Sequence, residues 1–311
     1  MIRVETAGRR TDEYRRARQL VLDDSALETR WIEVGAAGRE VQLLERGHGP
    51  PIVVLHGTGP GASFLRPLLD RLDGLRVIAP DRPGQGLSAP VDISRREFRD
   101  RAVRWVGQLL DALELDRVAL AGHSMGGVWA LWYALACPER VTRLVLLAPP
   151  QLPGTRCPLP FRVMGTAGLF RLLQRVSPPS PHSSLQFARL MGEGDSLVDH
   201  PDLVDLMVAG AKDPVIVSTN MNEARAIVSP AALITPSGFR RRTRVRPDEL
   251  GRITAPTLVV WGNREPLGSV DVAQHIARLI PNATLEVVPA GHAPWLGQPD
   301  LTAKLINEFA L

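Results

Sequence analysis

The stretch Gly122-His123-Ser124-Met125-Gly126-Gly127 directly follows the apolar run 117–121 (RVALA) and precedes a helical pattern at 125–136. A Gly-x-Ser-x-Gly between a strand and a helix places the serine on a tight turn, because glycines without a Cβ let the two elements approach each other. The hydroxyl then lies at a helix N-terminus, whose free N–H groups favour developing negative charge. The sequence therefore predicts that Ser124 is a nucleophile.

Strand and helix patterns alternate on both sides of this turn. Strand patterns occupy 30–34, 40–45, 52–55, 75–79, 117–121, 141–147, 256–261 and 283–288, and helical patterns occupy 10–24, 62–73, 94–113, 125–136, 269–280 and 299–310. From residue 52 onward the strand runs are apolar, as expected where helices cover both faces of a parallel sheet. The chain is therefore predicted to form a doubly wound α/β sheet.

One interval interrupts this alternation. Between 149 and 247 the sequence has helical patterns at 159–175, 183–192, 201–211 and 214–228 but no comparable strand pattern, and prolines open and close it. We interpret 149–247 as a helical cap over the carboxyl edge of the sheet. It would be inserted between two segments of an α/β core, 30–148 and 248–311, behind an N-terminal helical extension at 1–29.

Composition excludes several classes of protein. Of 311 residues, 44% are hydrophobic and 23% charged, which are ordinary values for a globular chain. No run of 18 apolar residues is present, and the N-terminus lacks the apolar stretch of a signal peptide, so we expect a soluble, cytoplasmic protein that does not enter a membrane. The net charge is only +4. We therefore interpret the basic run 240–246 (RRRTRVR) as a solvated hinge strand rather than a nucleic-acid or carboxylate site.

A serine becomes a good nucleophile only when a base takes its proton and an acid orients that base. His292 lies in the loop 290–295 (AGHAPW), directly after the last strand pattern. Glu265 lies in 261–266 (WGNREP), after the preceding strand pattern, and Asp271, the other nearby acid, belongs to the next helix. We predict His292 as the base and Glu265 as the acid, with an exposed Glu265 and an acid from elsewhere as the alternative.

Acyl chemistry also requires two backbone donors for the oxyanion. The N–H of Met125, the residue after the nucleophile, is predicted to be one of them. The second is expected in the loop 56–61 (HGTGPG), which follows the strand pattern at 52–55. We choose Thr58, with Gly59 as the alternative, and interpret His56 as a structural residue that binds nearby backbone.

Together these motifs resemble the α/β-hydrolase superfamily over about residues 30–311. The resemblance rests on 56–57 (HG), 81–88 (DRPGQGLS), 122–127, 261–265 (WGNRE) and 291–292 (GH), in the order serine, acid, histidine. It implies an eight-stranded, mostly parallel sheet with an antiparallel second strand and a cap inserted after the sixth strand. It also implies that 81–88 is a structural turn. Glu265 departs from the family, where aspartate is the usual acid.

The resemblance leaves the reaction open. We expect a serine hydrolase that cleaves a carboxylic ester, lactone or related acyl compound through an acyl-enzyme, without metal or cofactor. The segment 56–63 (HGTGPGAS) looks like that of the meta-cleavage C–C hydrolases, which usually carry Asn before the nucleophile and Trp after the histidine. This chain has His123 and Ala293 there. A C–C hydrolase is therefore the first alternative, and a ligand-binding sensor or a cyclase or lyase on the same fold are the others.

The substrate is expected to be a small, apolar acyl compound, because apolar side chains are numerous in the predicted cap and near the motifs. The predicted lining residues are Phe64, Trp129, Phe161, Met164, Phe170 and Trp295. Ordinary helix packing is the alternative interpretation of the cap residues among them.

Overall fold

The computed structural model describes residues 10–91, 96–194, 196–229, 231 and 235–311. Within these residues eight strands form one sheet in the order β1-β2-β4-β3-β5-β6-β7-β8. The strands are β1 (Glu28–Val34), β2 (Arg39–Arg46), β3 (Pro51–Leu55), β4 (Arg76–Pro80), β5 (Val118–His123), β6 (Val141–Leu147), β7 (Thr257–Gly262) and β8 (Ala283–Val288). Strand β2 runs antiparallel to both of its neighbours, and the other pairs are parallel. The predicted mostly parallel sheet is confirmed.

Helices cover both faces of this sheet, which explains why β3 to β7 are apolar almost throughout. One face packs against α3 (Phe98–Ala112), α4 (Met125–Ala136) and α11 (Val270–Leu279). The other packs against α2 (Arg66–Leu69), α12 (Pro294–Gly297) and α13 (Pro299–Ala310), with the 3₁₀ turn Ala62–Leu65 beside them. The predicted helix 94–113 begins at Phe98, and its first two residues lie outside the described residues.

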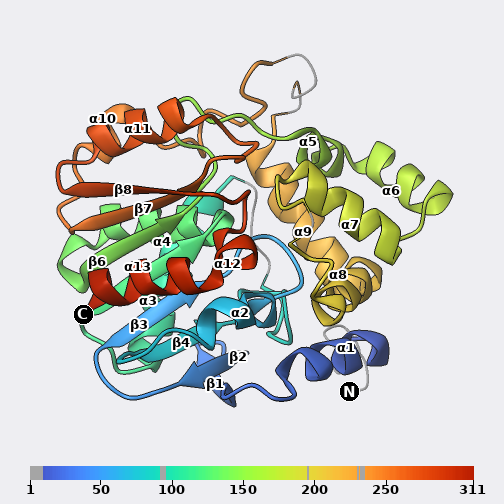
Figure 1. Cartoon of the computed structure of the whole chain (residues 1–311), viewed down its shortest axis with the longest axis horizontal. Coiled ribbons are helices and arrows are strands. Elements are labelled where there is room, and N and C mark those ends of the chain that lie inside the picture. Colours follow the sequence, from blue (N-terminus) through green and yellow to red (C-terminus); the bar gives the residue numbers. More distant parts are fainter. Residues whose placement is uncertain (1–9, 92–95, 195, 230, 232–234) are drawn as a thin grey trace.

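The predicted insertion contains a group of helices on one side of the sheet (Figure 1). They are α5 (Leu159–Gly165), α6 (Ala167–Val176), α7 (Pro181–Leu190), α8 (Pro201–Lys212) and α9 (Pro214–Ile227). The single helix expected at 159–175 is two helices, because the backbone of Thr166 leaves the helical region at φ −100°, ψ 91°. Of the interval 149–247, residues 195, 230 and 232–234 lie outside the described part of the chain.

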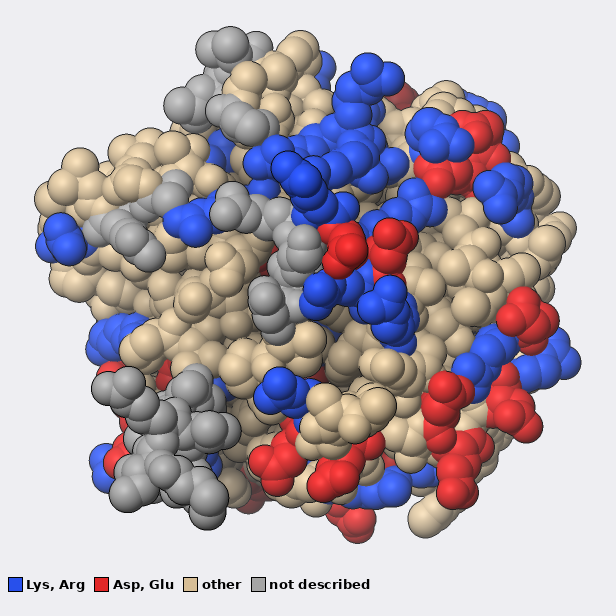
Figure 2. All heavy atoms as spheres, turned by 180° about the vertical axis from the view of Figure 1, so that it is seen from behind, with Lys and Arg blue, Asp and Glu red and all other residues tan. Residues whose placement is uncertain are grey.

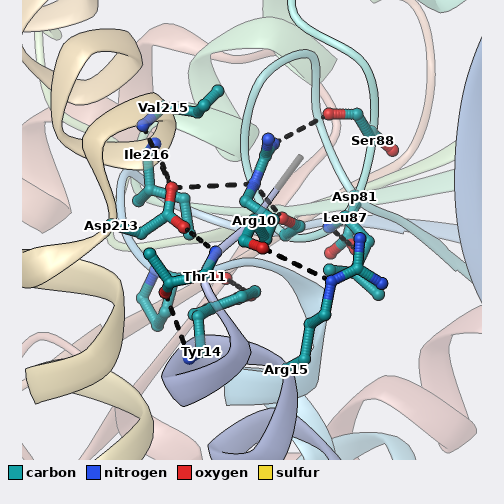
Figure 3. A network of polar contacts seen from close by, with 12 residues as sticks. Arg10, Thr11, Tyr14, Arg15, Asp81, Leu87, Ser88, Asp213, Val215 and Ile216 are labelled. Atoms are coloured by element: carbon teal, nitrogen blue, oxygen red, sulfur yellow. Dashed lines mark hydrogen bonds and ion pairs between the residues drawn. The ribbon is translucent and has the colours of Figure 1, made fainter. Parts of the chain in front are cut away.

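The N-terminal helix α1 (Asp12–Leu22) and the two described residues before it, Arg10 and Thr11, connect the core with this helical group (Figure 3). The buried Arg10 guanidinium donates to the carbonyl oxygens of Gly86 and Ser88 at 2.7 and 2.9 Å, and it lies 4.0 Å from the carboxylate of Asp213. Asp213 in turn accepts from the Thr11 N–H at 2.8 Å and caps the N-terminus of α9. The extension is therefore attached to both parts of the molecule.

The basic run 240–246 is not a strand. Residues 241–244 form turns ahead of the short helix α10 (Pro247–Leu250), and Arg246 pairs with Asp248 at 2.7 Å. Figure 2 shows basic side chains gathered in the upper middle of the back face, with acidic side chains below and to the right of them. The expected hinge strand was wrong: residues 241–244 turn, and the described backbone makes only single bonds to distant segments on either side of them, from the Arg240 N–H to the Ile227 carbonyl and from the Val245 N–H to the Gln151 carbonyl.

In the part of the chain that the structure describes, none of the helices has both the length and the apolar character needed to cross a membrane.

Candidate active site

Ser124 lies on a strained turn between β5 and α4. Its backbone has a φ of 51°, in the left-handed region that side chains other than glycine rarely adopt. The flanking glycines make the turn possible: a Cβ on Gly122 would lie 2.4 Å from the backbone of Gly126, and one on Gly126 would lie 2.1 Å from the Leu55 carbonyl oxygen. The local sequence thus forces the serine side chain out at the start of the helix.

Three predicted residues meet at the carboxyl ends of three strands. Ser124 follows β5, Glu265 follows β7 and His292 follows β8. The Ser124 hydroxyl lies 3.0 Å from Nε2 of His292, and Nδ1 of the same ring lies 2.9 Å from Oε2 of Glu265. The other oxygen of Glu265 accepts from the Leu267 N–H at 2.9 Å. Glu265 is buried, at 6% exposure, so it is not the exposed loop residue of the alternative interpretation.

Burial and charge act in opposite directions on His292. Burial alone would lower its pKa, because it disfavours the charged ring. The Glu265 carboxylate on Nδ1, assisted by Glu193, outweighs burial, so the pKa of His292 lies above its ordinary value. Because the carboxylate accepts the Nδ1 proton, Nε2 of the neutral ring is free to accept a proton from Ser124.

The loop 56–61 lies directly beside the serine. A Cβ on Gly57 would come within 3.0 Å of the Ser124 Cβ, so only glycine allows this approach. His56 accepts the Arg82 N–H on Nε2 at 2.9 Å, and its Nδ1 donates to the Gly57 carbonyl at 2.7 Å. Burial, followed by the Arg82 charge, holds the pKa of His56 well below its ordinary value. His56 is therefore neutral and binds backbone, as interpreted from the sequence.

A cavity of about 350 Å³ opens above Ser124 and His292, between the strand ends and the helices α5 to α9. Its walls are mostly apolar. The predicted residues Phe64, Phe161, Met164 and Phe170 line it, and so do Phe187, Met191, Met207 and Ile216. Its polar lining includes Thr58, Gln174, Glu193 and Asn220, and no Lys or Arg is among the described residues of the wall.

Two predicted lining residues do not line this cavity. Trp129 lies on α4, a helix whose residues 125–134 are all buried, and its ring packs edge-on against Phe98, with ring centres 6.0 Å apart. Trp295 is fully buried and packs against the His123 ring at 4.4 Å. His123 in turn donates from Nε2 to the His292 carbonyl at 2.9 Å. Trp295 therefore supports the histidine loop from behind rather than facing a substrate.

Comparison with known proteins agrees with this architecture. Residues 50–297 match the family described as the alpha/beta hydrolase fold, which covers more than half of the chain. The chain belongs to the α/β-hydrolase fold family. The predicted fold is therefore confirmed, and the protein is a hydrolase by family.

Two relatives of this α/β hydrolase carry names of C–C bond hydrolases. A 2-hydroxy-6-oxononadienedioate/2-hydroxy-6-oxononatrienedioate hydrolase of Cupriavidus pinatubonensis is 34% identical over 78% of this chain and 81% of its own length. A 2-hydroxy-6-oxo-6-phenylhexa-2,4-dienoate hydrolase of Burkholderia cepacia is 29% identical over 85% of this chain and 88% of its own length. Among solved structures, a carboxylesterase of Bacillus subtilis matches with a TM-score of 0.74 at 23% identity, covering 95% of this chain and 96% of its own. That likeness shows the fold alone.

Two carboxylates of the hydrolase reach the site from the helical insertion, and sequence reasoning missed both. Glu193 follows α7, and its Oε1 accepts the N–H of Ala293, the residue after His292. Glu223 lies on α9, and its Oε2 accepts the Thr58 hydroxyl at 2.6 Å. Their partners lie 100 and 165 positions away in the chain. No local pattern could have identified them.

Proposed function

We propose that this chain is a serine hydrolase that cleaves an uncharged carboxylic ester or lactone through an acyl-enzyme. The observation that carries the proposal is the continuous hydrogen-bonded row from Ser124 through His292 to Glu265, open to an apolar cavity. A serine, a base and an orienting acid at these distances are the groups that acyl transfer requires.

Acylation begins when the Ser124 oxygen attacks the carbonyl carbon and its proton passes to Nε2 of His292. The Glu265 carboxylate stabilises the imidazolium that forms. The carbonyl oxygen becomes an oxyanion, which accepts hydrogen bonds from the N–H groups of Met125 and Thr58. Collapse of this intermediate breaks the ester C–O bond, and the Nε2 proton passes to the leaving alkoxide. The alcohol departs and leaves an ester on Ser124.

Deacylation repeats these steps with water. The water oxygen attacks the acyl carbon while His292 takes a proton from the water. The N–H groups of Met125 and Thr58 bind the second oxyanion. The bond to Ser124 then breaks, its oxygen regains the proton, and the carboxylic acid leaves.

The charge of the cavity supports an uncharged substrate. The names of the two relatives specify a dienedioate or trienedioate and a dienoate, which carry carboxylates. A buried carboxylate requires a cation or several hydrogen-bond donors. The described cavity wall offers neutral donors such as Gln174 and Asn220 but no Lys or Arg, and it contains the acidic residue Glu193. A neutral ester or lactone fits this wall better.

C–C bond hydrolysis of the meta-cleavage type is the second candidate, and the names of the relatives favour it. The two reactions are distinguished by substrate: we expect p-nitrophenyl butyrate to be turned over with a higher kcat/KM than a 2-hydroxy-6-oxohexa-2,4-dienoate. The reverse order would select the C–C hydrolase.

Pre-steady-state hydrolysis and active-site labelling test the common mechanism. We expect a stoichiometric burst of p-nitrophenol and a fluorophosphonate adduct on the peptide that contains Ser124. Both should be lost in Ser124→Ala, since the Ser124 oxygen is the atom that forms the acyl-enzyme bond in this mechanism. A variant that retained burst and turnover would refute the proposal, and ligand-induced stabilisation without any product would favour the sensor.

A further inference from the structure

Glu223 joins the helical insertion to the loop beside the nucleophile. Its side chain is 5% exposed and lies on α9. The Arg82 guanidinium donates to both of its oxygens, at 2.7 and 3.2 Å, and the Thr58 hydroxyl donates to Oε2 at 2.6 Å. The Gln85 amide donates to the same Oε2 at 3.5 Å. One carboxylate thus binds two side chains from the 81–88 turn and one from the loop 56–61.

The backbone of the same two segments is joined on the other side. The Arg82 N–H donates to Nε2 of His56, whose Nδ1 donates to the Gly57 carbonyl. Arg82 therefore contacts the loop twice, once through His56 and once through Glu223. These contacts form a closed ring around residues 56–58, and the ring contains one group of the insertion, Glu223.

The exact position of the loop 56–61 is important because its backbone lies against Ser124. The Gly57 backbone lies against Ser124, and the next N–H along the chain belongs to Thr58. A loop of three glycines and a proline has little side-chain packing to hold it, so its geometry depends on its few polar contacts. Oxyanion donors act only when they are held close to the position of the charge, and a misplacement of about 1 Å can cost roughly 100-fold in rate.

We propose that Glu223 is a positioning residue: by binding the Thr58 hydroxyl and Arg82 together, it holds the loop 56–58 where its N–H can stabilise the oxyanion. The proposal rests on the serine hydrolase function proposed above. It makes the activity of the core dependent on the placement of α9, because the loop is fully held only when the insertion lies in this position.

The charges in the ring are consistent with this arrangement. Arg82 is 1% exposed and Glu223 5%, so each carries a buried charge that the other compensates. The Arg82 guanidinium also lies 4.8 Å above the Trp129 ring. The pKa of His56 is well below its ordinary value, so its ring stays neutral and keeps Nε2 as an acceptor. The strongest partner for the Thr58 hydroxyl is therefore the Glu223 carboxylate.

Thr58→Val and Glu223→Gln test the proposal, with acylation measured as the burst rate on p-nitrophenyl butyrate. Thr58→Val keeps the side-chain shape and the Arg82–Glu223 pair but removes the donor, so it remains informative if Glu223→Gln fails to fold. We expect each to slow acylation about 10- to 100-fold with KM within about twofold. The acid limb of the pH profile, which reports His292, should not move. The double variant should be no slower than the slower single variant.

Matched variants separate positioning from general damage. Thr58→Ser retains the hydroxyl and should recover acylation to within about threefold of the wild type. Asn222→Ala alters an exposed residue next to Glu223 on α9 and should leave acylation unchanged. Acylation by Thr58→Val within twofold of the wild type, or a loss that Thr58→Ser does not rescue, would overturn the proposal while the hydrolase stands. Full acylation by Ser124→Ala would instead overturn the hydrolase function itself.

Discussion

The core side and the insertion side of the site are built on different principles. On the core side Ser124, Glu265 and His292 follow the parallel strands β5, β7 and β8, whose carboxyl ends lie at one edge of the sheet with β6 between β5 and β7. On the insertion side the cavity wall and the two carboxylates come from helices and loops that reach the core only by packing. The first arrangement follows from the order of strands, whereas the second depends on the whole fold.

The two carboxylates of the insertion side also differ from each other. Arg82 donates to both oxygens of Glu223, and Thr58 and Gln85 donate to its Oε2. Glu193 accepts the Ala293 N–H on one oxygen, and its Oε2 is buried without a hydrogen-bond partner among the described residues. Burial raises the pKa of Glu193 to about 7, and the nearby Glu265 charge adds to this effect. Glu223 is thus paired with a buried cation, whereas the pKa of the Glu193 carboxyl is raised by burial.

The largest effect should come from the core side, in Glu265→Gln. The amide no longer fixes the histidine tautomer or stabilises the imidazolium, so kcat should fall by a factor on the order of 10⁴. Glu265 also raises the pKa of His292, so its loss should lower that pKa and move the acid limb of the kcat/KM profile to lower pH.

Asp271→Asn is the control for this experiment, since Asp271 is an exposed acid in the first turn of α11. Its kinetics should match the wild type. If Glu265→Gln kept wild-type kcat and an unmoved acid limb, another group would have to orient His292.

The next largest effect is expected at Arg10, which connects the core with the insertion, and it should be a loss of folding stability. Arg10→Met removes the buried guanidinium that binds Gly86, Ser88 and Asp213, and should lower the free energy of unfolding by about 3 kcal/mol. Lys212→Gln is the matched control, because Lys212 and Glu13 link α8 to α1 through an exposed pair at 2.8 Å. It should cost less than about 1 kcal/mol. Urea unfolding measures both variants. If Arg10→Met and Lys212→Gln lost equal free energies of unfolding, burial would not make the Arg10 contacts stronger than the Lys212–Glu13 pair.

The core side of the site could be predicted from the sequence, whereas most of the insertion side could not. The positions of Ser124, Glu265 and His292 could be predicted because each depends on a strand end and a short local motif. Trp129 and Trp295 were predicted to line the cavity and do not. Trp129 lies on a helix that is apolar on all sides, so its sequence does not show which face meets the cavity. The position of Trp295 close to His292 in the chain does not show which way its ring points. Glu193 and Glu223 gave no signal, since their roles arise from contacts between segments far apart in the chain.

Glu193 has one buried oxygen, Oε2, without a hydrogen-bond partner in the part of the chain that the structure describes. Its carboxyl has a pKa near 7 in the folded protein and near 4.5 as a free side chain. Folded chains therefore bind more protons between these pH values, and the stability contributed by this group falls as the pH rises from about 4.5 to about 7. Glu193→Gln keeps an acceptor for the Ala293 N–H and removes the titration. Its stability relative to the wild type should rise over this window by at most about 3 kcal/mol.

Urea unfolding at pH 5 and pH 8 measures this difference. Glu308→Gln, which alters an exposed acid on α13, should follow the wild type at both pH values. Parallel pH dependences for Glu193→Gln and the wild type would mean that the Glu193 carboxylate is compensated in the folded protein after all.

The smallest effect is expected for Phe161→Ala, in the preference of the enzyme for long over short acyl chains. Phe161 lines the cavity and packs edge-on against Phe187, with ring centres 5.9 Å apart, so Phe161→Ala should lengthen the pocket. Each additional buried methylene contributes about 0.8 kcal/mol, and part of this is lost to imperfect packing. The kcat/KM ratio of p-nitrophenyl octanoate to butyrate should therefore rise about tenfold. Trp129→Phe should leave this ratio unchanged, because Trp129 does not line the cavity and a change in its packing would alter both rates together. A shift of the ratio by Trp129→Phe and none by Phe161→Ala would mean that the acyl chain does not bind in the cavity that Phe161 lines.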